Sequence, residues 1–336
     1  MIKLNTTGSV PPLAGIAIFW ASCVGFLAAF WLPMPWSWIL GVVAIEPILY
    51  GSHEALHGHF VPRHSRLGGR KHQEIAAVVG TALQGMNLYL LRPAHLHHHR
   101  YGRYDDGYAP DVAPTKPTLL NRLHYYVYLI GLPGLLWQGA GFARLLRRPE
   151  NLPFLAKINF RERLDRRYFV AQGCVIATLA YLIAVGGFAA FAAFEVTFCL
   201  LWSVQQNIAH YGLRGVDPET DRVCARSYYL PWPLNWITYG STAHFLHHAD
   251  TSVPAWELYD EAPLRRAEDR LGISVVTQYG VWPFLRDAFK QFKGPIRVHD
   301  LETTWMQASD RPSREVSQSD GYSYRRGRRW SRSAAG

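Results

Sequence analysis

The chain has 336 residues, of which 49% are hydrophobic, and it carries a formal net charge of +10 with a mean hydropathy of −0.06. The average conceals a division. No Lys or Arg occurs from Leu4 to Pro62 or from Tyr168 to Leu213, whereas the intervening and following segments are strongly basic. Each segment without Lys or Arg is long enough for two bilayer crossings of about 20 residues. We therefore predict an integral membrane protein whose charge reflects one membrane face, and we expect no nucleic-acid partner.

The two segments without Lys or Arg predict four transmembrane helices in an all-α fold. In chain order, these spans cover about 11–31, 36–52, 168–188 and 190–210. Residues of about 255–300 are expected to form helices that make a cytoplasmic cap on the membrane-embedded part. We divide the chain into a membrane-embedded domain with its cap, residues 1–300, and a disordered basic tail, residues 301–336.

Two shorter apolar stretches lie between the second and third spans. Residues 75–91 contain Gln84 and Asn87, and residues 124–141 contain Gln138. Their polar side chains favour interfacial or re-entrant helices over full spans. The basic residues between the second and third spans, from Arg63 to Arg167, place this long middle segment in the cytoplasm by the positive-inside rule. The prediction is a multi-pass protein with its active site on the cytoplasmic side.

Histidines are concentrated in three boxes. Box one is H-x-x-x-H, and boxes two and three are both H-x-x-H-H; a further single histidine, His210, ends the fourth span. Residues at i, i+3 and i+4 share one helical face, so each H-x-x-H-H is expected to present three imidazoles to one point. Nine nitrogen ligands are too many for one metal but suit two metals with four or five each. The nine are His53, His57, His95, His98, His99, His210, His244, His247 and His248.

The remaining histidines are expected to be structural. His97 points away from the face of box two on a regular helix. The others have no partner at ligand spacing; they are His59, His64, His72, His124 and His299.

The ordered boxes, placed around two pairs of spans, resemble the integral-membrane fatty acid desaturase superfamily, including its hydroxylase and ketolase branches. The resemblance covers about residues 10–265, and Pro254 and Leu258 after box three match the family's H-H…P-x-x-x-L continuation. It implies two iron ions held by the nine histidines, O₂ as co-substrate and attack on a lipid C–H bond. Related desaturases often carry Asn four residues before the isolated histidine. Here Gln206 holds that place and Asn207 follows, so either side chain is a candidate to hold a metal-bound water.

Acidic residues beside the boxes are candidates to orient the imidazoles. Glu54 and Asp250 are the two that we single out, and Asp105, Asp106 and Asp111 are further ones. Glu46 lies inside an apolar span, where a carboxylate is costly and usually functional. We expect Glu46 to line a substrate tunnel or to bind a headgroup, with pairing inside the helix bundle as the alternative.

The reaction stays open between two outcomes. Fatty acyl desaturation is the first hypothesis, and hydroxylation or ketolation of an alkyl chain, carotenoid or aminolipid headgroup is the second. The segment NIAHYGL at 207–213 is similar to one in membrane alkane hydroxylases, which keeps hydroxylation open. The sequence contains no heme-binding H-P-G-G segment and no C-x-x-C pair, so electrons are expected from a separate, ferredoxin-like protein. It does not indicate an oligomeric state.

Two remoter hypotheses start from the histidines alone. His53-Glu54-Ala55-Leu56-His57 matches the H-E-x-x-H pattern of zinc proteases, in which Glu54 would be the general base. That hypothesis needs one metal and leaves both H-x-x-H-H boxes unexplained. A histidine-rich metal carrier would need ionisable residues along the spans, which offer few besides Glu46 and Glu195.

Overall fold

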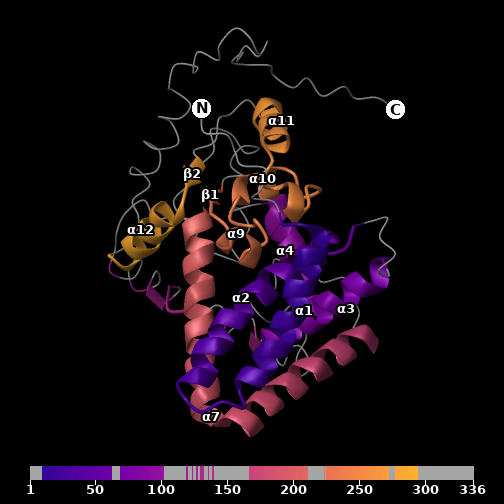
Figure 1. Cartoon of the computed structure of the whole chain (residues 1–336), viewed down its shortest axis with the longest axis vertical. Coiled ribbons are helices and arrows are strands. Elements are labelled where there is room, and N and C mark those ends of the chain that lie inside the picture. The colour runs from indigo at the N-terminus through magenta and orange to yellow at the C-terminus, as the bar shows by residue number, and fades with distance from the viewer. Residues whose placement is uncertain are drawn as a thin grey trace.

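The computed structural model describes residues 10–62, 69–101, 166–210, 223, 225–271 and 277–293, together with ten residues between 119 and 139. Long helices form one end of the molecule and short elements gather at the other (Figure 1). The long part comprises α1 (Pro12–Ala29), α2 (Trp36–His57), α3 (Gly69–Leu83), α4 (Leu88–Tyr101) and α7 (Arg166–His210). The short part, called the cap below, comprises β1 (Ser227–Tyr229), α9 (Leu234–Ile237), α10 (His244–Ala249), η4 (Ala255–Glu257), α11 (Glu261–Leu271), β2 (Thr277–Tyr279) and α12 (Val281–Phe292).

Three of the described helices, α1, α2 and α7, are long and apolar enough to cross a membrane. The pair α3 and α4 would make a fourth span if it counts as one, but it bends by 102°. That bend lies within the stretch 75–91, for which we predicted an interfacial or re-entrant helix. The prediction of a mostly helical protein with several apolar spans is confirmed. The stretch 124–141 and the tail 301–336 lie largely or wholly outside the described residues.

Helix α7 is broken at Gly187. At 45 residues it would measure about 68 Å if straight, more than twice the hydrocarbon thickness of about 30 Å. Gly187 has φ 76° and ψ 160°, a conformation that residues with a side chain rarely adopt, and the two limbs diverge there (Figure 1). The limbs, 166–186 and 188–210, match the predicted spans 168–188 and 190–210.

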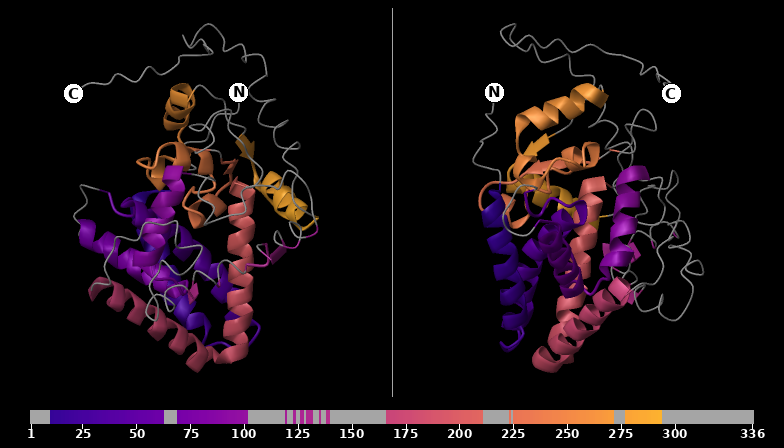
Figure 2. Two further views of the ribbon diagram at one scale, coloured as in Figure 1. Left: turned by 180° about the vertical axis from the view of Figure 1, so that it is seen from behind. Right: turned by 90° about the vertical axis from the view of Figure 1, so that its right-hand side faces the viewer.

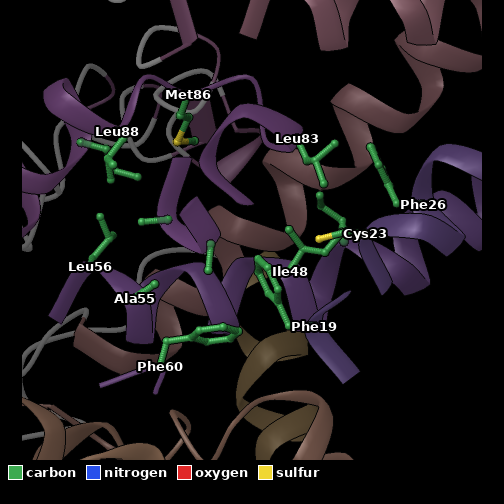
Figure 3. Packing of buried hydrophobic residues seen from close by; sticks show 14 of the residues in the cluster. Phe19, Cys23, Phe26, Ile48, Ala55, Leu56, Phe60, Leu83, Met86 and Leu88 are labelled. Carbon is green, nitrogen blue, oxygen red and sulfur yellow. The ribbon is translucent and has the colours of Figure 1, made fainter. Parts of the chain in front are cut away.

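The helices pack through an aromatic and aliphatic core, part of which Figure 3 shows. Phe26 of α1 meets Phe194 of α7 edge to face, with ring centroids 5.1 Å apart. Polar side chains add links between helices: Trp38 donates to the Thr197 hydroxyl at 3.0 Å, and Gln84 donates to the Ser52 hydroxyl at 2.8 Å. Such interhelical bonds are typical where water is scarce.

Close approach of α2 and α3 depends on Gly80. A Cβ at this position would lie 2.5 Å from the Ser52 Cβ, closer than real contacts allow. We expect Gly80→Ala to destabilise the protein by about 1–3 kcal/mol, because the helices must move apart. Thermal unfolding in detergent measures the effect. Gly173→Ala on α7 is the matched control, since its Cβ would meet nothing within 4 Å; an equal loss in both variants would contradict the explanation.

The cap contains a feature that the all-α prediction missed. β1 and β2 form a two-stranded parallel sheet, with Ser227 opposite Thr277 and Tyr229 opposite Tyr279. Three-residue strands leave too short a pattern to recognise in the sequence. The sheet holds the segment before box three: Tyr228 N–H donates to the Thr242 carbonyl at 2.8 Å, and Phe245 N–H donates to the Ser227 hydroxyl at 3.1 Å.

Candidate metal centre

The eight box histidines and His210 meet where the long helices reach the cap. The end of α2 contributes two, α4 three, the end of α7 one and α10 three. In both views of Figure 2 the cap lies at the opposite end of the long helices from the bend in α7. Residues almost 200 positions apart in the chain therefore share one site. The side chain of His97 lies outside the described part of the structure.

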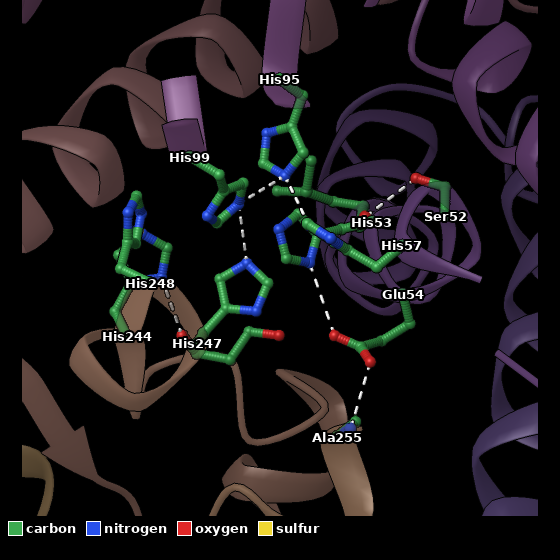
Figure 4. A network of polar contacts seen from close by, with 12 residues as sticks. Ser52, His53, Glu54, His57, His95, His99, His244, His247, His248 and Ala255 are labelled. Atoms are coloured by element: carbon green, nitrogen blue, oxygen red, sulfur yellow. Dashed lines mark hydrogen bonds and ion pairs between the residues drawn. The ribbon is translucent and has the colours of Figure 1, made fainter. Parts of the chain in front are cut away.

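The histidines fall into two groups. In the first, one ring nitrogen from each of five residues lies within 4.8 Å of all the others. Figure 4 shows these rings gathered between α2, α4 and α10. The five are His53, His57, His95, His99 and His247.

The second group lies beside the first and is the more enclosed. Three of its members meet the same distance criterion and are all buried: His98, His210 and His248. His244 joins them, because its Nε2 lies 2.9 Å from the Nε2 of His210 and 3.2 Å from that of His248. The His99 and His248 rings, one from each group, have centroids only 4.3 Å apart. Two groups of five and four are thus immediate neighbours.

The division corrects one expectation from the sequence. We expected each H-x-x-H-H to aim three imidazoles at one point, but the structure splits each triplet. His95 and His99 belong to the first group, and His98 belongs to the second. Box three is divided in the opposite sense, with His244 and His248 in the second group and His247 in the first. Helical geometry permits the split, because positions i and i+4 differ by about 40° around the axis whereas i+3 and i+4 differ by about 100°.

The contacts within the first group cannot all be hydrogen bonds. The Nε2 of His95 lies 2.8 Å from that of His57 and 2.9 Å from that of His99, whose Nε2 lies 3.0 Å from that of His247. A protonated Nε2 has one N–H to direct at one acceptor, and an unprotonated one has only a lone pair. Converging nitrogens are satisfied together by a cation between them. Metal–nitrogen distances of about 2.1 Å at right angles would separate neighbouring nitrogens by about 3.0 Å. The residues therefore fit a metal.

The box-three histidines are held in the form that a metal requires. Burial lowers the pKa of His244 to about 3, and the neighbouring His53 and His98 add to the effect. The pKa values of His247 and His248 are also lowered well below the usual 6.5, mainly by burial and further by the surrounding histidines. Neutral imidazoles keep a lone pair for coordination. For His244, the Nδ1–H donates to the Ser241 carbonyl at 3.2 Å, which leaves Nε2 free to bind.

A comparison with models of protein families finds a match over most of the chain. The family model described as "Fatty acid desaturase" matches residues 29–278, about three quarters of the chain. The chain belongs to the fatty acid desaturase family. A sequence comparison with curated proteins finds no match. Membership agrees with the long apolar helices, and the protein is a membrane protein of this family with a buried histidine cluster that suits a metal site.

Glu54 is the acid that lies against this desaturase-family site. Its side chain is 2% exposed, and its Oε1 lies 3.5 Å from the Nδ1 of His53. Its Oε2 accepts a hydrogen bond from the Ala255 N–H at 3.1 Å, as Figure 4 shows. Glu54 thus links α2 to the segment after box three and lies close to the Nδ1 of His53. At 3.5 Å the Oε1 and Nδ1 atoms are close but not hydrogen-bonded, whereas a carboxylate that orients a metal-binding imidazole accepts a hydrogen bond from the ring N–H.

We expect Glu54→Ala to weaken metal binding at the first group by about 10–100-fold, because His53 loses the carboxylate that lies close to its Nδ1. Metal titration followed by elemental analysis measures the change. Asp250→Ala is the matched control. The described contacts of Asp250 are with Ser252, whose hydroxyl donates at 2.6 Å, and with Arg270 at 4.0 Å. Equal losses in both variants would argue against a special role for Glu54.

Of the two amides before His210, Asn207 is the more deeply placed. Its side chain is 1% exposed, and neither its Nδ2 nor its Oδ1 has a partner among the described residues. Gln206 is only partly buried. A buried amide without partners is costly unless something else satisfies it. Asn207 also lies three residues before His210, on the same face of α7.

Glu46 pairs inside the bundle. Gln205 of α7 donates to the Glu46 Oε2 at 2.8 Å and accepts a hydrogen bond from the Tyr50 hydroxyl at 3.1 Å. Glu46, Tyr50, His53 and His57 are spaced i, i+4, i+7 and i+11, so they share one face of α2. We did not predict the roles of Gln205 and Tyr50; the spacing along α2 was the available signal. Ser241 and Ala255 contact His244 and Glu54 through backbone atoms, so their side chains could not indicate these contacts in the sequence.

Two of the histidines that we expected to be structural, His59 and His72, lie in the described part of the structure. The Trp20 Nε1–H donates to the Nε2 of His72 at 3.0 Å, which joins α1 to α3 away from the two groups. His59 lies near the first group, with its ring centroid 6.4 Å from that of His57, but it is not one of the five. His64, His124 and His299, together with Asp105, Asp106 and Asp111, lie outside the described residues.

Proposed function

We propose that this protein is a membrane-bound, non-heme di-iron oxidoreductase that uses O₂ to attack an unactivated C–H bond of a lipid, with fatty acyl desaturation as the reaction. The observation that carries the proposal is the division of nine histidines into adjacent groups of five and four. A single-zinc protease would use His53, His57 and one more ligand, and would leave the second group unexplained. Family membership supports a lipid substrate.

Each part of the site would have a separate task. The first group would hold one iron and the second group the other, and the bound pair would supply activation of O₂. Glu54 would keep His53 in its binding orientation. Asn207, buried without a described partner, is the better candidate than Gln206 to hold a water beside His210.

The two groups differ in access. Three of the five histidines in the first group are partly exposed, whereas only His244 of the four in the second group is. We infer that substrate approaches along the face of α2 that carries His53 and His57. Glu46 lies on that face about 10 Å below His53, and its bond to Gln205 would fix it at the wall of the substrate path.

The membrane arrangement follows from the charges. We propose that α1, α2 and the two limbs of α7 cross the bilayer and that the cap faces the cytoplasm, where the basic residues lie. Electrons would arrive there from a separate acidic donor of the ferredoxin type.

Mass spectrometry of lipids from cells that express the protein tests the proposal. A lipid that loses two mass units reports desaturation, and one that gains sixteen reports hydroxylation. Fragmentation then identifies the modified chain or headgroup. The matched control is the His98→Ala variant in the same host. Desaturation is the expected result; a product that persists with His98→Ala, or no lipid product with an active donor present, would contradict the proposal.

A further inference from the structure

Helix α12 carries an exposed apolar stripe. Trp282 is 72% exposed, Leu285 38%, Phe289 64% and Phe292 48%. Their spacing of three, four and three residues places all four within about an 80° arc of the helix surface. Four large apolar side chains in one narrow, exposed strip exceed the scattered apolar residues that a soluble surface normally shows.

The opposite side of α12 is already occupied by protein. Phe284 packs edge to face on Tyr228, with ring centroids 5.4 Å apart, and the Tyr228 hydroxyl donates to Asp287 at 2.9 Å. Gln291 is fully buried and donates to the Val204 carbonyl of α7 at 3.4 Å. The stripe is therefore a second apolar face, which the folding of the cap does not use.

Basic residues border the stripe on one side. Arg286 and Lys290 of α12, and Lys293 directly after the helix, lie within about a 60° arc next to it. Arg286 and Lys290 also pair with Asp287, at 2.9 and 3.6 Å. Large apolar side chains, with Trp and Phe among them, beside a row of basic residues are the pattern of a helix that lies flat in a membrane interface. The apolar side enters the boundary of the acyl chains, and the basic side chains reach the headgroups.

The attachment to α7 sets the depth of α12. Val204, which Gln291 contacts, lies six residues before His210 and about 12 Å along the helix from Val196, which is 59% exposed on the apolar limb. α12 therefore meets α7 close to the end where that limb leaves the hydrocarbon.

We propose that the Trp282–Leu285–Phe289–Phe292 stripe of α12 is a lipid-binding surface that lies in the interface of the same bilayer that α7 crosses. This assignment concerns the cap and does not depend on the reaction proposed above. It gives the bilayer a mechanical link to the metal centre. Asp287 holds Tyr228 of β1, and the neighbouring Ser227 hydroxyl accepts the hydrogen bond from Phe245, the residue after His244.

Spin-label accessibility in phosphatidylcholine–phosphatidylglycerol vesicles tests the proposal. Single cysteines at 282, 285, 289 and 292 are labelled in a full-length protein whose native cysteines are replaced by alanine and whose metal content is unchanged. Lys290→Cys is the matched control on the same helix. We expect labels on the stripe to collide at least about fivefold more with dissolved O₂ than with a water-soluble nickel complex, as lipid contact requires, and the label at 290 to show the reverse ratio.

Two other patterns would overturn the assignment. Preferential collision with the nickel complex at 285 and 289 would show that the stripe faces water. Protection from both reagents would show that protein covers it, whether a second copy or an electron donor. A stripe variant, Phe289→Gln with Leu285→Gln, adds a second measurement: its O₂ accessibility at 282 should fall at least twofold while its metal content stays the same.

Discussion

Alanine at His95 is expected to remove one metal from the protein and to abolish lipid oxidation, and alanine at His98 is expected to do the same through the other group. The two residues lie less than one helical turn apart on α4 but belong to different groups. Each substitution removes one ligand nitrogen and leaves a cavity that the remaining imidazoles cannot close. Elemental analysis should fall from about two metals per chain to about one, and activity should fall by well over 100-fold.

The control for this pair is His72→Ala. His72 is bonded to Trp20 and lies outside both groups, so its loss should cost about 1 kcal/mol of stability and no metal. If His95→Ala and His98→Ala keep both metals, or if His72→Ala loses them equally, the division into two groups is wrong.

Removing the metals is expected to lower the melting temperature by on the order of 20 °C. A ligand that binds only the folded state stabilises it by about 4 kcal/mol when present at a thousand times its dissociation constant, and two sites add their effects. A change of 1 kcal/mol shifts the melting temperature by about 2–4 °C in proteins of 150–250 residues. Here the metals would connect four separate helices, α2, α4, α7 and α10, so their loss would loosen the contacts between these helices.

Thermal unfolding in detergent, with and without a strong chelator, measures this shift. Re-addition of ferrous iron under anaerobic conditions should restore the higher temperature. The double variant His95→Ala/His98→Ala is the control, because it should melt at one temperature under all three conditions. A wild-type protein indifferent to chelation would show that the histidines do not bind metal in the folded state.

The histidine boxes could be predicted from the sequence because helical spacing is a local property. The positions of His53 and His57, one turn apart, already place them on the same face. The split within each H-x-x-H-H could not be predicted so simply. Whether His98 joins His95 depends on what faces α4 from two sides, and those partners, His210 and His247, come from distant parts of the chain.

The helices could be predicted where long runs of apolar residues mark them. Their ends and bends were harder to predict where histidines or other polar residues interrupt those runs. We ended the second span at residue 52, but α2 continues to His57, so box one is an extension of the span itself. The bend between α3 and α4 follows Gly85, whose φ of +72° suits glycine, and Gln84 and Asn87 on either side bond to other helices. Polar residues in this apolar stretch were the visible signal.

The partners of the acids depended on three-dimensional structure. Sequence proximity made Glu54 and Asp250 equal candidates, since Glu54 lies within box one and Asp250 comes soon after box three. In the fold, Glu54 is buried between α2 and η4, whereas Asp250 is 37% exposed and bonds within its own turn. The burial of Glu54 and the exposure of Asp250 distinguish the two acids, and both depend on how the cap packs on the long helices.

The most direct test is to locate the metals. Crystals of the iron-loaded protein, measured at the iron absorption edge, should show two anomalous peaks. One peak should lie about 2 Å from ring nitrogens of the group that contains His57 and His95, and the other about 2 Å from those of the group that contains His98 and His210. A single peak shared by both groups, or peaks away from these nitrogens, would contradict a centre built from two adjacent metal sites.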